Sequence, residues 1–239
     1  MNKEAINKAR AVYYGLFASL LTFFDNANDL DVIQKTVDLL AQNPLDEECN
    51  LAFSNMQNLL ITGGYTALKE ESDTVFFSPY SAYIPVTASF FLENRDDGKK
   101  RLEMVNYVLS SNYRRDKEKF KELEDHIGFV VLFMQKMIEE ELGGNEKSAQ
   151  LSREVFVNIL NPFVDDFIVA LHAHENSHFY QELAVVMQSF MALERLYLDV
   201  KRPTKENEDE APKIVTKELK KKRKPITPRP KKNMEEFVL

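Results

Sequence analysis

The sequence of 239 residues has no tryptophan, only seven glycines and a single cysteine, Cys49. One cysteine excludes a disulfide within the chain and any zinc or iron–sulfur site built from cysteines. A free thiol usually behaves as a small apolar side chain, so Cys49 is predicted to be partly buried in a helix. This cysteine usage is typical of a cytoplasmic protein, which is the location we expect.

Long apolar runs are also missing. No stretch approaches the roughly 18 uncharged apolar residues that a membrane span needs, so no stable membrane insertion is expected. Lys3, Lys8 and Arg10 precede an apolar run as in a signal peptide. However, Glu4 interrupts the basic part and no small-x-small cleavage site follows, which predicts a protein that is not exported.

Most enzyme signatures are absent too. The chain has no glycine-rich phosphate loop and no Ser/His/Asp or Cys/His arrangement. The sequence therefore favours a protein that is not an enzyme, with no catalytic residue, cofactor or metal.

The residues that are present favour an all-α fold. Apolar residues make up 44% of the chain, and Leu, Met, Glu, Lys and Ala are common while β-type alternation is rare. We expect one helical-bundle domain of about nine or ten helices over residues 1–200. Residues 201–239 are rich in Lys and Pro and poor in apolar residues, which predicts a disordered tail.

Charge is distributed unevenly. The net charge is −7, but residues 213–239 hold ten Lys/Arg against three Glu, so the remainder carries about −14. An acidic body favours a basic partner and argues against nucleic acid.

Apolar spacing and capping residues predict where the helices lie. The expected ranges are 3–24, 29–43, 46–69, 99–112, 124–142, 147–160, a helix with Pro162 at its first position, and 176–199. In the second range Val32 and Leu39 are counted among the apolar positions. In the range 99–112 the expected inner face is Leu102, Val105, Val108 and Leu109.

Residues 70–86 are predicted to form an ordered loop, because two prolines and large aromatic residues interrupt the helical pattern. Farther on, Glu122, Asp125 and His126 stand at the start of a strongly apolar helix. Asp125 there has two open roles, a helix cap or a binding residue. His126 is likewise either a structural histidine or part of a site.

These features resemble a known family, the TorD/DmsD/NarJ-type chaperones that mature molybdenum redox enzymes. The family carries Glu-Pro-x-Asp-His before an apolar helix, and Glu122, Asp125 and His126 match while Leu123 replaces the proline. Other parts of residues 5–198 that resemble the family are Arg10, Tyr14, the loop Ser78-Pro79-Tyr80-Ser81-Ala82-Tyr83, and Phe179-Tyr180.

The resemblance implies a cytoplasmic chaperone that is all-helical, either a monomer or a domain-swapped dimer. Such proteins bind the twin-arginine leader of a molybdoenzyme catalytic subunit, and some bind the mature part, until the molybdenum cofactor is inserted and export begins. The client would be a formate dehydrogenase or an anaerobic reductase.

Physical chemistry supports a site for such a leader. Two guanidiniums beside an apolar segment require carboxylates beside apolar surface, because arginine pairs with carboxylates in a bidentate way. Glu122, Glu124 and Asp125 supply carboxylates, and Phe129 to Met134 form either the core or the floor of a groove. The predicted peptide-binding residues are Glu122, Asp125, His126, Pro79, Tyr80, Tyr83, Phe76 and Phe77.

A competing motif is His174-Glu175-Asn176-Ser177-His178, which fits the H-E-x-x-H pattern of zinc hydrolases. The reading requires one uninterrupted helix. Asn176-Ser177 is typical of a helix break, which favours a role without catalysis.

The basic tail offers a second alternative, in which the protein is a helical adaptor that contacts its partner through residues 201–239. The tail is otherwise a solvated segment or a competitor for the acidic surface of its own body.

Overall fold

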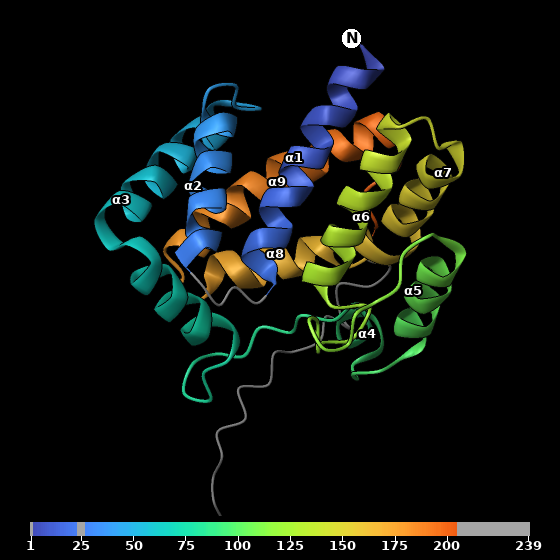
Figure 1. Ribbon diagram of the computed structural model, residues 1–239. Helices are drawn as coiled ribbons and strands as arrows, with labels where there is room; N and C mark the ends of the chain where they lie inside the picture. Colours follow the sequence, from blue (N-terminus) through green and yellow to red (C-terminus); the bar gives the residue numbers. More distant parts are fainter. Residues whose placement is uncertain (1, 23–26, 205–239) are drawn as a thin grey trace, which may run out of the picture.

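The computed structural model of the protein describes residues 2–22 and 27–204, and these fold into helices joined by loops, of which 77–87 and 111–126 are long (Figure 1). This confirms the all-α prediction. The elements are α1 (Lys3–Leu21), α2 (Ala27–Ala41), α3 (Glu47–Phe76), α4 (Ala88–Glu93), α5 (Lys99–Ser110), α6 (Ile127–Leu142), α7 (Glu146–Val155), the π-helical turn η1 (Phe156–Leu160), α8 (Val164–Ala173) and α9 (Phe179–Leu198). Within the described ranges the β structure is one isolated bridge, Thr87 with His126.

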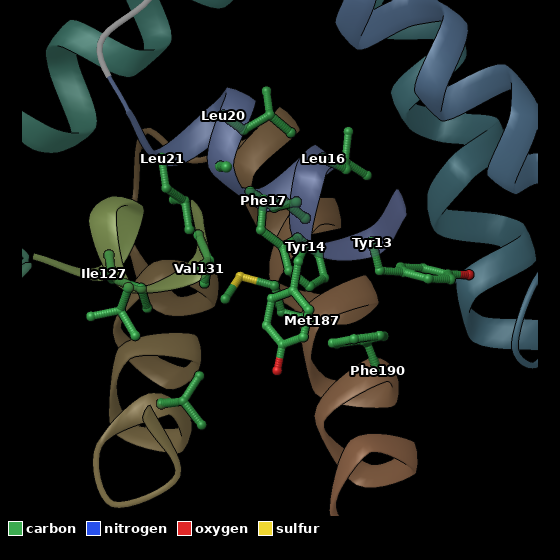
Figure 2. Close-up of a cluster of buried hydrophobic side chains, with 14 of the residues drawn as sticks. Tyr13, Tyr14, Leu16, Phe17, Leu20, Leu21, Ile127, Val131, Met187 and Phe190 are labelled. Carbon is green, nitrogen blue, oxygen red and sulfur yellow. The ribbon is translucent and has the colours of Figure 1, made fainter. Parts of the chain in front are cut away.

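Helix α1 occupies the middle of the bundle. It packs against α6, α2 and α9, with α2 and α3 on one side and α6 and α7 on the other (Figure 1). Its inner face is aromatic, and Tyr13, Tyr14 and Phe17 surround Phe190 of α9 with ring centroids 5.0, 5.0 and 5.3 Å away (Figure 2). Aromatic rings bury large areas and favour such stacked and edge contacts, so this cluster joins the first and last helices of the described bundle.

A buried ion pair crosses the same interface. Arg10 of α1 donates from Nε and Nη2 to both carboxylate oxygens of Glu194 in α9, each at 2.7 Å, and Tyr14 donates to Glu194 Oε1 at 3.0 Å. Asn7 accepts the third guanidinium bond at 2.8 Å. Burial disfavours the charge, but the bonds to Glu194 outweigh it and raise the pKa of Arg10.

Close approach of α6 to α1 depends on a glycine. A Cβ on Gly128, in the first turn of α6, would lie 2.7 Å from the carbonyl carbon of Leu21. Backbone cannot move aside as a flexible side chain can. Gly128 therefore sets how near the start of α6 lies to the end of α1.

The predicted boundary of the third helix is wrong. Helix α3 bends at Gly64, which has φ 60° and ψ −156°, but continues to Phe76 rather than ending at residue 69. After the bend Leu68, Ser72 and Val75 face inward at helical spacing. Burial of this inner face, rather than the prolines and aromatic residues that follow, decides the conformation as far as Phe76.

Three smaller predictions also need correction. Val32 and Leu39 of α2, and Leu102 and Leu109 of α5, are exposed. In α5 the buried residues are Met104 and Val108, because α5 is rotated relative to the expected face. Pro162 lies in the turn before α8 rather than at its first position, because η1 continues the preceding helix to Leu160.

The remaining boundaries agree to within a few residues. Cys49 is fully buried in α3, and burial raises the pKa of its thiol to about 11. Residues 205–239, most of the predicted tail, lie outside the described residues, while residues 201–204 have no regular secondary structure. The two-part division of the chain at residue 200 stays a prediction.

None of the described helices is by itself long and apolar enough to cross a membrane. One pair bent by 59°, Glu146–Leu160 with Val164–Ala173, meets the requirements of length and composition when taken together.

The buried pair leads to a stability prediction. In the part of the chain that the structure describes, Glu194→Gln leaves Arg10 with only the more distant Glu141, at 3.9 Å, as a counter-charge. We expect the free energy of unfolding to fall by about 3 kcal/mol, measured by urea denaturation followed by circular dichroism, since a broken buried pair leaves an uncompensated charge. The control Glu139→Gln removes a partly exposed pair with Lys136 and should cost less than about 1 kcal/mol. Equal losses in the two variants would contradict this account.

Gly128→Ala tests the close approach of α1 and α6. Overpacking against backbone should cost about 2 kcal/mol of unfolding free energy in the same assay. Gly15→Ala in α1 is the matched control, because its Cβ would meet only the side-chain amide of Gln135, at 2.9 Å. That amide can rotate away, and alanine gains up to about 1 kcal/mol in a helix. The interpretation fails if Gly128→Ala is as stable as Gly15→Ala.

Candidate functional site

The two segments predicted to form a site lie side by side. The chain leading into α4 and the chain leading into α6 run antiparallel, with Ile127 N–H donating to Val86 O at 2.8 Å and Ala88 N–H to Asp125 O at 3.0 Å. The aromatic loop, defined as residues 77–83, precedes the first strand-like segment. The second segment carries Glu122, Asp125 and His126. The fold therefore places the separate predicted residues near one another.

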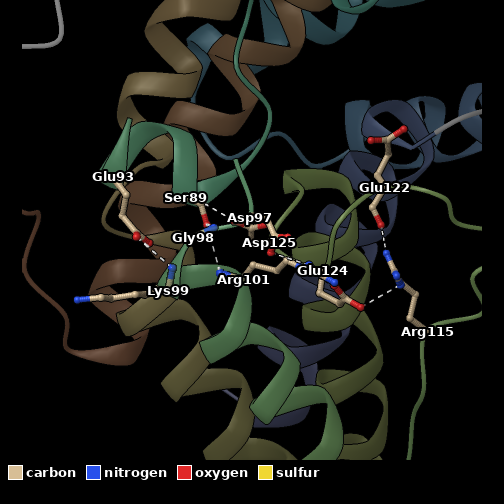
Figure 3. A network of polar contacts seen from close by, with 10 residues as sticks. All are labelled: Ser89, Glu93, Asp97, Gly98, Lys99, Arg101, Arg115, Glu122, Glu124 and Asp125. Atoms are coloured by element: carbon tan, nitrogen blue, oxygen red, sulfur yellow. Dashed lines mark hydrogen bonds and ion pairs between the residues drawn. The ribbon is translucent and has the colours of Figure 1, made fainter. Parts of the chain in front are cut away.

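Asp125 is turned inward. It is fully buried, and its Oδ2 accepts from Ser89 N–H at 2.9 Å in the first turn of α4 (Figure 3). Its other oxygen, Oδ1, has no hydrogen-bond partner among the described residues. Asp125 thus caps α4, a helix other than the one it precedes in sequence, and it is not accessible to a ligand in this conformation.

His126 is the residue that caps α6. Its Nδ1 accepts from Gly128 N–H at 3.0 Å, and its ring lies edge-on to Phe120 with centroids 5.7 Å apart. Burial lowers the pKa of His126 to about 4. The ring is therefore neutral near pH 7 and holds the junction between the two segments.

Glu124 is also committed to internal contacts. Arg101 Nε approaches its Oε2 at 2.8 Å and Arg115 Nε its Oε1 at 3.0 Å (Figure 3). Burial alone would raise the pKa of Glu124, but the two arginines outweigh it and hold the value below the ordinary one. The expectation that Glu124 offers a carboxylate to a partner is therefore wrong, since both oxygens already face guanidiniums.

Glu122 remains at the surface. Arg115 donates to its backbone oxygen, while the side chain extends outward (Figure 3). In the aromatic loop Tyr80 is 96% exposed, Tyr83 59% and Phe77 53%, and Pro79 is exposed as well. These residues form the accessible part of the predicted site.

Phe76 has a different position. It lies at the end of α3, half-buried, with its ring perpendicular to that of Tyr180 at 5.0 Å. Of the apolar stripe in α6, Phe129, Phe133 and Met134 are buried. Most of the stripe therefore belongs to the core, one of its two expected roles, while Leu132 is only partly buried.

Asp96 is a neighbour that sequence reasoning missed. Partial burial, and then the nearby carboxylates of Asp96 and Glu122, raise the pKa of Tyr83. Asp96 accepts from the Thr87 hydroxyl at 3.0 Å, which holds it beside the start of α4. No spacing in the sequence relates Asp96 to Glu122. The acidic pair, Asp96 and Glu122, thus arises from folding.

The structure also has a groove, formed by residues outside the predicted peptide-binding set. This groove of about 370 Å³ runs between α2 and α6 with α1 as its floor, and none of its lining residues is charged. The lining residues are Val12, Gly15, Ala18, Ser19, Thr22, Val32, Thr36, Leu39, Leu132 and Gln135.

The H-E-x-x-H motif does not form a metal site. Helix α8 ends at Ala173 and α9 begins at Phe179, so residues 174–178 are not helical and the two histidines do not share a helix face. Within the described ranges, no group of three or more His, Cys, Asp or Glu side chains is arranged to hold a metal ion. The geometry removes the basis of the zinc-hydrolase alternative.

Comparison with known families is decisive for the class of protein. Residues 42–169, more than half of the chain, match the family described as the nitrate reductase delta subunit. The chain belongs to this family. It is thus a member of the TorD/DmsD/NarJ-type maturation chaperones, which are not catalytic, and the resemblance is confirmed. No curated protein matches the chain.

The matched residues of this delta-subunit family member run from the end of α2 into α8 and include every predicted peptide-binding residue. They do not include Glu194 or His174. The Arg10–Glu194 pair is therefore a feature that the structure, rather than the family match, brings to light.

The neutral state of His126 predicts a pH dependence. Its folded-state pKa of about 4 lies below the unfolded value of about 6.5, so the unfolded chain binds a proton that the folded chain excludes between these values. Stability is complete above about pH 6.5 and falls as pH drops toward 4, by about 2 kcal/mol between pH 7 and pH 5. Urea unfolding at the two pH values measures the difference.

His126→Asn keeps an acceptor for Gly128 N–H without a titrating group, so we expect the pH 7 to pH 5 difference to shrink by about 2 kcal/mol. His172→Asn, at an exposed position of α8, is the control and should leave the difference unchanged. An unaltered pH dependence in His126→Asn would exclude this source.

Proposed function

We propose that this protein is a maturation chaperone that binds the twin-arginine leader of a nitrate-reductase-type molybdoenzyme catalytic subunit. The observation that carries the proposal is an exposed aromatic residue, Tyr83, beside the carboxylates of Asp96 and Glu122. Membership of the delta-subunit family supports the chaperone role and the class of client.

The chemistry of the leader fits this surface. Guanidinium is planar, pairs with carboxylates and stacks on aromatic rings, so two adjacent arginines suit two acids around a tyrosine. Tyr80, Phe77 and Pro79 supply rigid contact area next to the acidic pair at low conformational cost. The net charge of about −14 outside residues 213–239 attracts a basic peptide toward the body.

The other predicted residues serve the site indirectly. Asp125 and His126 cap α4 and α6 and hold the segment that presents Glu122. Phe76 anchors the base of the aromatic loop against Tyr180. In this proposal the leader contacts Glu122, Asp96 and the aromatic loop, while Asp125, His126 and Phe76 position them.

The apolar part of the leader requires a separate surface, because Phe129, Phe133 and Met134 of α6 are buried. The uncharged groove between α2 and α6 is suitable, since an apolar helix can lie on a floor of small residues such as Gly15, Ala18 and Ser19. Its Thr22 end adjoins Gly128, two residues after His126. One extended leader would then contact both surfaces.

The remaining parts of the proposal follow from this role. The chaperone acts in the cytoplasm, as a monomer or a domain-swapped dimer. It holds the catalytic subunit until the molybdenum cofactor is inserted and then releases it for export. Formate dehydrogenases and anaerobic reductases other than nitrate reductase are the alternative classes of client.

Calorimetric titration with a panel of synthetic twin-arginine leaders tests the proposal. We expect one leader to bind and its Arg-Arg→Gln-Gln control to fail. Asp96→Asn with Glu122→Gln should weaken binding about tenfold, because each exposed charge contact contributes about 1 kcal/mol or less. The affinity of the natural protein should fall as salt rises, and that of the variant should fall less.

The matched control is Glu48→Gln with Glu146→Gln, which removes the same net charge at exposed positions in the first turns of α3 and α7. It should bind the leader nearly as well as the natural protein. Equal weakening in both variants would assign the effect to overall charge rather than to the acidic pair. Failure of every leader to bind the natural protein would refute the proposed function.

A further inference from the structure

His174 has a contact that neither the family match nor the proposed function uses. It follows the last residue of α8 with an extended backbone, φ −70° and ψ 126°, and its side chain is buried. The ring Nε2 lies 3.1 Å from the carbonyl oxygen of Ala82, a residue of the aromatic loop 92 positions earlier.

The hydrogen bonds define which nitrogen carries the proton. Asn176 N–H donates to Nδ1 at 3.2 Å, so Nδ1 is an acceptor. A carbonyl oxygen only accepts, so Nε2 must donate to Ala82 O. Both ring nitrogens of a neutral imidazole are therefore in use, one within the α8–α9 turn and one toward the loop.

The other hydrogen bonds of loop residues 78–83 are local. In the described part of the chain, Ser81 Oγ donates to Thr74 O at 2.6 Å, and Tyr80 N–H donates to Ser78 Oγ at 3.2 Å. These bonds shape the loop and join it to the end of α3. The bond from His174 is the one that connects residues 78–83 to an element distant in sequence.

The turn that carries His174 is itself firmly held. Glu71 of α3 accepts from His178 N–H at 2.8 Å and from Tyr180 N–H at 2.9 Å, which caps the start of α9. Tyr180 also donates its hydroxyl to Leu20 O at 2.9 Å. His174 therefore projects from a turn that is fixed to both α3 and α1.

We propose that His174 is a positioning residue that fixes the aromatic loop and so raises affinity for the leader without touching it. This rests on the proposed function for the ligand, but its effect on the loop does not. A loop already held in its binding conformation loses less entropy when a peptide binds, which increases affinity. The first histidine of the H-E-x-x-H sequence thus acts through a backbone hydrogen bond.

The absence of tryptophan from the sequence allows a direct test on the full-length protein. Tyr80→Trp places one tryptophan in the loop at a position that is almost fully exposed. Time-resolved fluorescence anisotropy then reports nanosecond motion of the loop. In this background we expect His174→Ala to increase the amplitude of the fast motion, and His174→Gln, whose amide can donate to Ala82 O, to restore most of the order.

Leader binding is measured separately with Tyr80 retained. We expect His174→Ala to weaken binding about three- to tenfold, the range that loss of one hydrogen bond implies, and His174→Gln to recover most of it. His172→Ala and His178→Ala change exposed histidines of the same region and should alter neither loop motion nor binding. Circular dichroism verifies that each variant keeps its helical content.

The two readouts separate the possible failures. Unchanged loop motion in folded His174→Ala would overturn the inference whatever the leader does. Increased motion with unchanged affinity would overturn the link between loop order and binding. If the natural protein binds no leader, the proposed function fails, and the anisotropy then decides whether His174 holds the loop.

Discussion

The bidentate contact between Arg10 and Glu194 is the constraint from which the arrangement of the bundle follows. An arginine cannot discharge by losing a proton, so a buried guanidinium must have its partners in place. This requirement sets α1 against α9 and places the rings of α1 around Phe190. Because α1 and α6 meet closely at Gly128, the position of α1 also sets where α6 begins. The start of α6 is the edge of the candidate site.

The charges around that edge divide into two groups with different roles. Both oxygens of Glu124 face arginines, Oδ2 of Asp125 accepts from the first turn of α4, and His126 is neutral. A buried charge that is already paired, such as Glu124, supports the fold rather than binding a ligand, because leaving its partners unpaired would be costly. The acidic pair, by contrast, lies where it acts on the exposed ring of Tyr83. Among the closely spaced acids of residues 122–125, Glu124 and Asp125 thus support the fold, while Glu122 is exposed at the surface.

The fate of the H-E-x-x-H sequence shows how backbone conformation decides the chemistry of a motif. Two histidines four residues apart become joint ligands only on a continuous helix. Asn176 and Ser177 interrupt the helix, so His174 turns to a carbonyl of the aromatic loop and His178 opens α9. The residues that could form a zinc site on a continuous helix therefore connect two parts of the chain that are distant in sequence. The shape of the aromatic loop depends on that connection as well as on its own proline, Pro79.

The all-α class, most helix positions and the two segments of the site were readable from apolar periodicity, capping residues and the Glu122–His126 pattern. These signals are local, because a helix satisfies its backbone hydrogen bonds within itself. The extension of α3 to Phe76, the exposure of Leu102 and the partner of Arg10 were not readable. Nor was the division between committed and exposed acids, including the recruitment of Asp96. Each of these depends on which residues distant in sequence pack together, and that is a property of the whole bundle.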